Sequence, residues 1–212
     1  MLKRFLGGFK KVLKGQRGYT LVEVAAVVAV TAILAAVVVP VAMDKMQEGK
    51  KAAALQDCKQ IGNAIAAFYK DTGVWPAYSV ATPKYFYILR SGDDVGHDPS
   101  SIWSGAIDYL ENHLVVDNPG GTFGGQDNWY LTWLKLNWKG PYSETLTKRD
   151  PWGNNYLVYV KAMYDDTATG STKKYGWIIS AGPNATLETQ VTANRLGGDD
   201  IGYYPFAAEK GH

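Results

Sequence analysis

The chain has 212 residues, 46% hydrophobic and 20% charged, a composition that excludes a disordered protein and favours one globular domain with appendages. The formal net charge is +2, but residues 1–18 carry +6 and no acid, so residues 19–212 carry −4 and offer no general basic surface for nucleic acid. The single cysteine, Cys58, excludes an internal disulfide, and three scattered histidines argue against a transition-metal site.

The first predicted element is a membrane-spanning helix. Twenty uncharged residues run from Val24 to Met43, and as a helix they rise about 30 Å, the thickness of the hydrocarbon core of a bilayer. The run is longer than the apolar core of an ordinary cleaved secretory signal. Because the basic residues precede it, residues 1–18 are expected in the cytoplasm and the chain after the span on the other side. A simple signal anchor is one interpretation of this pattern.

Glu23 is a lone acid at the front of the apolar run. A carboxylate costs up to ~3 kcal/mol at the bilayer centre and less near the edge, and such residues usually have a partner. Arg17 lies six residues earlier, a poor helical spacing for a direct pair. A cut after Gly18 would create an α-amino group at Tyr19, one turn from Glu23. That amine could pair with this carboxylate or with that of a neighbouring copy.

The pattern RG-YTLVEV, followed by a long apolar helix, resembles the class III signal of type IV pilins and type II secretion pseudopilins. The resemblance implies that a prepilin peptidase cuts between Gly18 and Tyr19 and methylates the new N-terminus at Tyr19. It also implies that Glu23 neutralises the terminal amine of a neighbouring subunit during assembly. Tyr19 stands where phenylalanine is commonest in the family. Pro40 stands where members often carry a proline that kinks the helix.

Four segments are therefore predicted: a cleaved basic leader at 1–18, a transmembrane and filament-core helix at 19–43, an amphipathic continuation at 44–73 and a head at 74–212. The continuation carries apolar residues at steps of three and four, and this stripe should face a core: Ala54, Leu55, Cys58, Ile61, Ile65, Phe68 and Tyr69. Gly73, with Pro76 after it, predicts the end of the helix. Cys58 is interpreted as a buried small hydrophobe.

The head is predicted to contain a variable insertion at 77–138. Within it, Thr82-Pro83 predicts a helix start and the spacing of apolar residues predicts a short helix over 104–114. Alternating residues at 134–138 predict a half-buried strand, and 118–128 reads as a turn-rich loop.

Two further runs, 156–164 and 174–181, are rich in β-branched and aromatic residues and predict a hairpin. A small sheet must cover its apolar face, and the amphipathic helix is the available cover. The expected fold is α+β, with a long N-terminal transmembrane and amphipathic helix packed on a small antiparallel β-sheet. This is the architecture that the resemblance to pilins also implies.

The C-terminal segments GPY, RDPWGNNY, SAGPNA and GGDDI resemble, in this order, the signature of the major pseudopilin of type II secretion. The resemblance covers about residues 14–76 and 139–202. In RDPWGNNY it implies a tight turn that feeds a strand. In the later loop it implies a calcium ion held by Asn184, Asp199 and Asp200, with a solvated turn as the alternative.

The resemblance implies a non-enzymatic structural subunit of a type IV filament, either a secretion pseudopilin or a pilus subunit. Its partners would be further copies of itself in a helical homopolymer, minor pilins or pseudopilins, the prepilin peptidase, and an inner-membrane assembly platform with its ATPase. The subunit would cross the bacterial inner membrane once, with its head outside the cytoplasm, before joining a periplasmic or extracellular filament.

Two alternatives are a signal-anchored extracytoplasmic enzyme and a glycan-binding module. The sequence contains no G-x-S-x-G elbow, and the pairs Asp93-Asp94 and Asp165-Asp166 lie in polar loop segments. Trp129, Trp133 and Trp138 could stack on glycans, but aromatic residues are also ordinary core and subunit-contact material.

Overall fold

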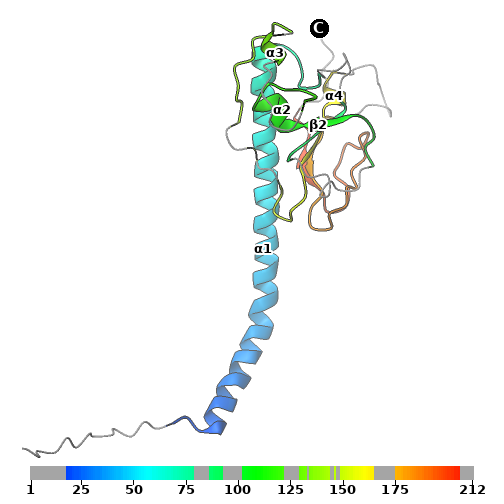
Figure 1. Ribbon diagram of the computed structural model, residues 1–212. Helices are drawn as coiled ribbons and strands as arrows, with labels where there is room; N and C mark the ends of the chain where they lie inside the picture. Colours follow the sequence, from blue (N-terminus) through cyan, green and yellow to red (C-terminus); the bar gives the residue numbers. More distant parts are fainter. Residues whose placement is uncertain are drawn as a thin grey trace, which may run out of the picture. The chain divides into compact units, whose positions relative to one another are not determined.

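The computed structural model describes residues 18–78, 86–92, 102–121, 129–132, 134–143, 146, 149–164 and 175–205. The chain divides into two compact units, 1–46 and 47–212. The elements in chain order (Figure 1) are α1 (Leu21–Thr72), β1 (Ile88–Arg90), β2 (Ile107–Tyr109), α2 (Leu110–Leu114), α3 (Trp129–Thr132), β3 (Leu157–Tyr159), α4 (Lys161–Tyr164), β4 (Ile178–Ser180) and β5 (Ile201–Tyr203).

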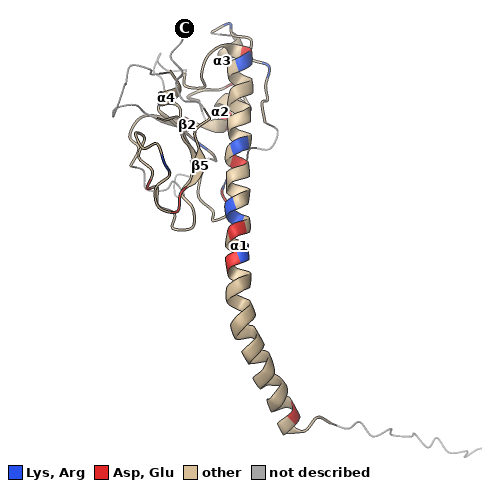
Figure 2. Cartoon of the chain, turned by 180° about the vertical axis from the view of Figure 1, so that it is seen from behind, with Lys and Arg blue, Asp and Glu red and all other residues tan. Residues whose placement is uncertain are grey.

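The first unit contains the apolar part of α1. By length and composition α1 can cross a membrane, and its most apolar window is not buried in the structure at all. Glu23 is the only charged residue of α1 before Asp44, and Figure 2 shows this charge-free stretch. The helix continues on both sides of Pro40. The kink predicted at Pro40 stays a prediction.

The end of α1 agrees with the sequence prediction. The helix stops at Thr72, and Gly73 follows with a φ of 72°, a left-handed conformation that glycine adopts at little cost. The Gly73 N–H donates to the Tyr69 carbonyl at 2.8 Å, which satisfies one of the last carbonyls of the helix.

The second unit is built on a five-stranded sheet with the order β2-β1-β3-β4-β5. β1 and β2 are parallel, and the other three neighbouring pairs are antiparallel. The hairpin predicted from the two later runs is confirmed as β3 and β4. The α+β class is likewise confirmed, as a long apolar helix packed on a mostly antiparallel sheet.

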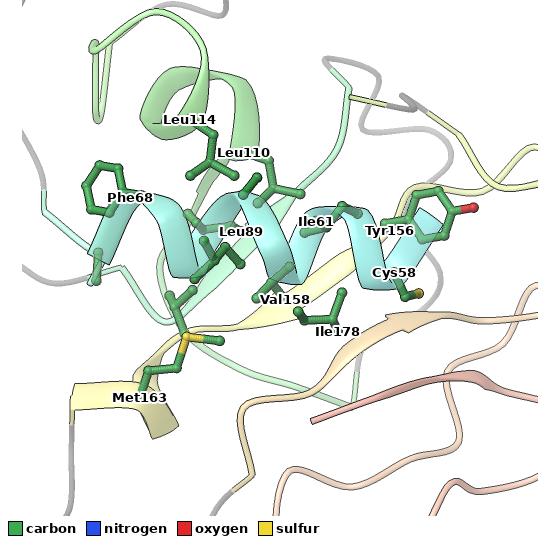
Figure 3. Close-up of a cluster of buried hydrophobic side chains, with 14 of the residues drawn as sticks. Cys58, Ile61, Phe68, Leu89, Leu110, Leu114, Tyr156, Val158, Met163 and Ile178 are labelled. Atoms are coloured by element: carbon green, nitrogen blue, oxygen red, sulfur yellow. The ribbon is translucent and has the colours of Figure 1, made fainter. Parts of the chain in front are cut away.

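One face of the sheet packs on α1. Leu89, Val158 and Ile178 lie in register across β1, β3 and β4 and belong to the main core cluster (Figure 3). Successive side chains of a strand point to opposite faces, so their neighbours belong to a second cluster on the other face. Five residues of the predicted stripe belong to the main cluster, together with Ala64: Ala54, Cys58, Ile61, Ile65 and Phe68. The prediction is wrong for Leu55, which is only partly buried, and for Tyr69, which is 41% exposed. The second cluster contains Ile88, Trp103, Leu157, Tyr159, Ala162, Trp177, Ile179 and Leu187.

The strand predicted at 134–138 is wrong. Described residues 134–138 contain no strand, and Lys135 has a φ of 51°, which a paired strand cannot accommodate. The first strand of the hairpin is also shorter than predicted. Its chain turns into α4, where the Met163 N–H donates to the Val160 carbonyl at 2.9 Å and closes a turn. The helix predicted over 104–114 is confirmed only for α2, because β2 precedes it.

The region predicted as an insertion supplies β1, β2, α2 and α3. At the other end of the chain, β5 follows the acidic pair of the segment GGDDI and pairs with β4. The predicted helix start at Thr82-Pro83 and most of the loop at 118–128 lie outside the described residues.

Candidate functional site

The start of α1 is held by reciprocal hydrogen bonds between Thr20 and Glu23. The Thr20 N–H and the Thr20 hydroxyl both donate to Glu23 Oε2 at 2.8 Å. In return, the Glu23 N–H donates to Thr20 Oγ1 at 3.2 Å. This is a capping box, in which the side chain of the N-cap residue and an acid three positions later satisfy N–H groups at the helix start. The Glu23 carboxylate therefore has a partner on its own chain.

The predicted cleavage position lies directly before this cap. Tyr19 is 88% exposed, and a Cβ placed on Gly18 would meet nothing within 4 Å. The Gly18–Tyr19 peptide bond is thus free of packing in the described chain. Residues 1–17 of the predicted leader lie outside the described residues.

Thr20 is a functional candidate that the sequence analysis did not identify. The signal was present, because T-x-x-E before an apolar run is the sequence signature of a capping box.

The predicted calcium ligands come together in one loop region. The Asn184 N–H donates to Asp199 Oδ2 at 3.2 Å. Asp200 Oδ2 accepts three hydrogen bonds, from the Glu188 N–H at 2.9 Å, the Thr189 N–H at 2.7 Å and the Thr189 hydroxyl at 2.6 Å. One oxygen of Asp200 thus orders the chain at Glu188 and Thr189.

Whether calcium fits this loop depends on the remaining side-chain oxygens of its acids and of Asn184. Asp199 Oδ1 and Asp200 Oδ1 are buried and have no hydrogen-bond partner among the described residues. Glu188 Oε2 faces the same region, since it accepts from the Asp199 N–H and from Asn184 Nδ2, each at 3.2 Å. The side-chain oxygen of Asn184 instead accepts from the Thr186 N–H at 2.7 Å, so Asn184 turns its amide NH₂ towards Glu188.

The oxygen atoms of this loop are of the kind that binds calcium, because calcium prefers carboxylate and carbonyl oxygens. Among the described residues, no group of three or more His, Cys, Asp or Glu is arranged to hold a metal ion. A shell of six to eight oxygens would therefore need backbone carbonyls beside the two free carboxylate oxygens. Burial raises the pKa of Asp200, and its hydrogen bonds from Thr189 and Glu188 oppose that rise. Glu188 is a candidate that the sequence analysis did not identify, since nothing in its sequence setting marks it.

The segment RDPWGNNY forms the tight turn that the sequence predicts. Asp150 Oδ1 accepts from the Trp152 N–H at 2.9 Å and the Asn154 N–H at 2.8 Å. Asp150 Oδ2 accepts from the Ser180 hydroxyl at 2.5 Å, which ties the turn to β4. Gly153 has a φ of 97°, a conformation that explains the glycine at this position.

The aromatic residues mostly fill the core. Trp129 is 9% exposed, and the Trp138 indole N–H donates to the His113 carbonyl at 3.1 Å. Trp133 lies outside the described residues. Trp129 belongs to the main core cluster and Trp138 is partly buried against it, which favours the core interpretation over glycan binding.

One buried row of side chains has the composition of a catalytic site. His113 Nδ1 lies 2.6 Å from Tyr130 Oη, and His113 Nε2 lies 2.9 Å from Asp108 Oδ2. His113 and Tyr130 are both 0% exposed, and burial raises the pKa of Tyr130. These groups are closed to solvent in the structure and form a hydrogen-bonded row inside the head.

The chain thus has an apolar helix with a capped acid at its start, long and apolar enough to cross a membrane, and this helix continues into a small α+β head. Residues 13–39 match the family model of the prokaryotic N-terminal methylation motif. The fimbrial protein EcpC of Eikenella corrodens is 35% identical over 66 residues, which are 31% of this chain and 43% of that protein. The match thus spans less than half the length of this relative. No solved structure matches the chain.

The motif and the fimbrial relative agree with the resemblance of the sequence to type IV pilins.

Proposed function

We propose that the chain is a structural subunit of a type IV filament. In this proposal, a prepilin peptidase cuts between Gly18 and Tyr19 and methylates the new N-terminus. The observation that carries the proposal is the capped carboxylate of Glu23, at the start of an apolar helix whose first half is exposed in the described chain.

Before assembly, the apolar part of α1 lies in the membrane. The capping box provides the Glu23 carboxylate with two donors from Thr20, which lowers the cost of keeping a charge near lipid. After the cut, the new α-amino group of Tyr19 is a stronger partner for the Glu23 carboxylate than Thr20 is, because the amine is charged. A neighbouring subunit that presents this amine gains the ion pair, which orders one subunit against the next.

The filament would cover the apolar side chains of α1 with those of other copies. Lipid tails are as apolar as valine and leucine, so leaving the bilayer gains little hydrophobic free energy. Close packing of small side chains and the ion pair at Glu23 must then favour the filament. The alanine- and valine-rich segment of α1 is suited to such close contact.

The partners and location follow from this proposal. They are minor pilins or pseudopilins, an assembly platform with its ATPase, and the inner membrane before assembly. A secretion pseudopilin and a surface pilus subunit both agree with the chain. The turn of RDPWGNNY and the segment GGDDI resemble the first, and the fimbrial relative bears the name of the second. Deletion of the gene distinguishes the two possibilities. Loss of protein secretion is expected for a pseudopilin, and loss of surface fibres is expected for a pilus subunit.

The decisive experiment is mass spectrometry of the N-terminus of the mature protein. The proposal expects a chain that begins with methylated Tyr19. A mature chain that still begins with Met1, or that begins after Ala42, would contradict it.

We also propose that the loop of Asn184, Glu188, Asp199 and Asp200 takes up calcium as a structural ion. The support is the pair of buried carboxylate oxygens, Asp199 Oδ1 and Asp200 Oδ1, for which the described part of the chain provides no hydrogen-bond partner. A buried carboxylate oxygen without a partner is costly, and a bound cation would remove that cost. The ion would contribute charge neutralisation and link the loop at Asn184–Glu188 to the start of β5.

A further inference from the structure

Trp152 is placed on α1 close to where the apolar span ends. Its indole N–H donates to Gln47 Oε1 at 3.2 Å, and Lys50 Nζ lies 5.9 Å from the centre of its ring. The ring is only partly buried. Gln47 follows Met43, the last residue of the apolar span, by four residues in the continuous helix α1.

This spacing corresponds to the thickness of a lipid headgroup layer. Four residues of helix rise about 6 Å. A bilayer has about 30 Å of hydrocarbon and about 40–45 Å including the headgroups, so the headgroup layer on each side is roughly 5–8 Å thick. When the span from Val24 to Met43 lies in the hydrocarbon, Gln47 and the indole ring bonded to it are therefore at headgroup level.

The chemistry of the contact suits this layer. Tryptophan is enriched at membrane–water interfaces because its ring is apolar and its N–H is polar. Lysine side chains lay their apolar stems along such a surface and keep the ammonium group in the headgroup region. Lys50 lies beside the ring, and Lys51 is exposed next to it. Of the nearby acids, Asp150 is buried and accepts a hydrogen bond from Ser180, whereas Asp44 and Glu48 of α1 are exposed.

We propose that Trp152, with Lys50 beside it, anchors the head to the phospholipid surface of the membrane before the subunit enters a filament. This inference rests on the proposed membrane stage of the subunit. The turn of RDPWGNNY then has a second role besides shaping the chain, because it carries the anchoring ring. The anchor sets the depth of α1 in the bilayer, and it must be released when the subunit is extracted.

The test uses the full chain reconstituted in phosphatidylcholine and phosphatidylglycerol vesicles. Its readout is quenching of tryptophan fluorescence by lipids brominated either near the headgroup or near the bilayer centre. All seven tryptophans lie outside the apolar span, so any quenching reports on the head. Trp75 provides a matched control, because it is also partly buried and stacks on Tyr69 in the last turns of α1.

The expected result is stronger quenching of the unchanged protein by the shallow bromine than by the deep one. Trp152→Phe should lose most of the shallow quenching, whereas Trp75→Phe should keep it. Equal shallow quenching in Trp152→Phe and the unchanged protein would overturn the inference. So would an absence of shallow quenching in the unchanged protein, a comparison that does not depend on how the variant folds.

The experiment also separates this inference from the proposed function. Flotation of the vesicles shows whether the chain inserts at all. A chain that does not float with the vesicles contradicts both the membrane stage and the anchor. A chain that floats but shows no quenching at Trp152 overturns the anchor alone.

Discussion

The two halves of α1 differ in what surrounds them, although they form one helix. In the first half, Ile33 and Val37 are each 68% exposed. In the second half, Ile65 and Phe68 are each 0% exposed, because the main core cluster of the head covers them. The second half is stabilised by the chain's own core. The first half has no such cover within the described chain, and in the proposed function lipid or other copies of the protein would provide it.

The largest expected difference between the two halves comes from truncating one isoleucine in each. Ile65→Ala should lower the free energy of unfolding by about 2–5 kcal/mol, the usual cost of a cavity in a packed core. Ile33→Ala should leave it unchanged. Thermal melts of the full chain in detergent, followed by near-ultraviolet circular dichroism, measure the two effects. Equal shifts in the two variants would contradict the division of α1 into a covered and an uncovered half.

Calcium should stabilise only the second unit. At a calcium concentration one hundred times the dissociation constant, the expected gain is about 2.7 kcal/mol. The melting midpoint of the full chain should rise with calcium and fall back with chelator. Asp200→Asn should abolish the shift, whereas Asp71→Asn, at an exposed ion pair with Lys139, should keep it. A midpoint that does not respond to calcium would remove the ion from the loop.

The calcium effect should also depend on pH. Burial raises the pKa of Asp200, so its carboxyl takes up a proton at a higher pH than an ordinary aspartate. Without calcium, this group contributes stability below the ordinary aspartate pKa, and the contribution is lost as pH rises through the raised value. With calcium, the ionised form is needed, so the stabilisation should be full at neutral pH and decline on acidification. A calcium shift that persists unchanged into the acid range would argue that Asp200 is not a ligand.

Glu23→Ala tests the first half in its assembled state. Loss of the ion pair should reduce filament yield at least about tenfold, which corresponds to ~1.4 kcal/mol per subunit contact. The melting midpoint of the head and the cleavage after Gly18 should not change. Glu48→Ala, at another exposed acid of α1, is the control. The yield is measured from sheared filaments, and a normal yield from Glu23→Ala would refute the proposed role of the carboxylate.

Thr20→Ala should have the smallest effect of the series. It removes the side chain that caps α1 and so costs about 1 kcal/mol of local helix stability. We expect filament yield to fall a few fold, with Thr20→Ser close to the unchanged protein because serine also caps. If Thr20→Ala and Thr20→Ser assemble equally well, the hydrogen bonds between Thr20 and Glu23 do not matter for assembly.

The helix and its covered stripe could be predicted from sequence because periodicity reports burial directly. Ile61 and Ile65 recur at helical spacing, and both face the core. The strand expected at 134–138 shows the limit of the same reasoning. Its residues alternate in polarity, but the backbone at Lys135 is left-handed, and no pattern of polarity reveals a φ angle. The three-residue strands β1, β2 and β5 were missed because they are too short to show a period.

The candidate site residues likewise divide into those that the sequence reveals and those that only the fold brings together. Glu23 stood out because an acid beside an apolar run is costly, and its partner Thr20 was encoded in the T-x-x-E spacing. Glu188 could not be found in this way. It approaches Asp199 through the fold of a loop, across eleven positions of the chain.

The order of the sheet limits how this protein can be shortened. β1 lies between β2 and β3, and both β1 and β2 come from residues 77–138. Excising that segment to obtain a minimal head would remove β1, one of the two neighbours of β3, and leave β3 as a new edge of the sheet. Its unpaired backbone groups would then be free to recruit a strand from another molecule, so the trimmed protein should aggregate rather than fold.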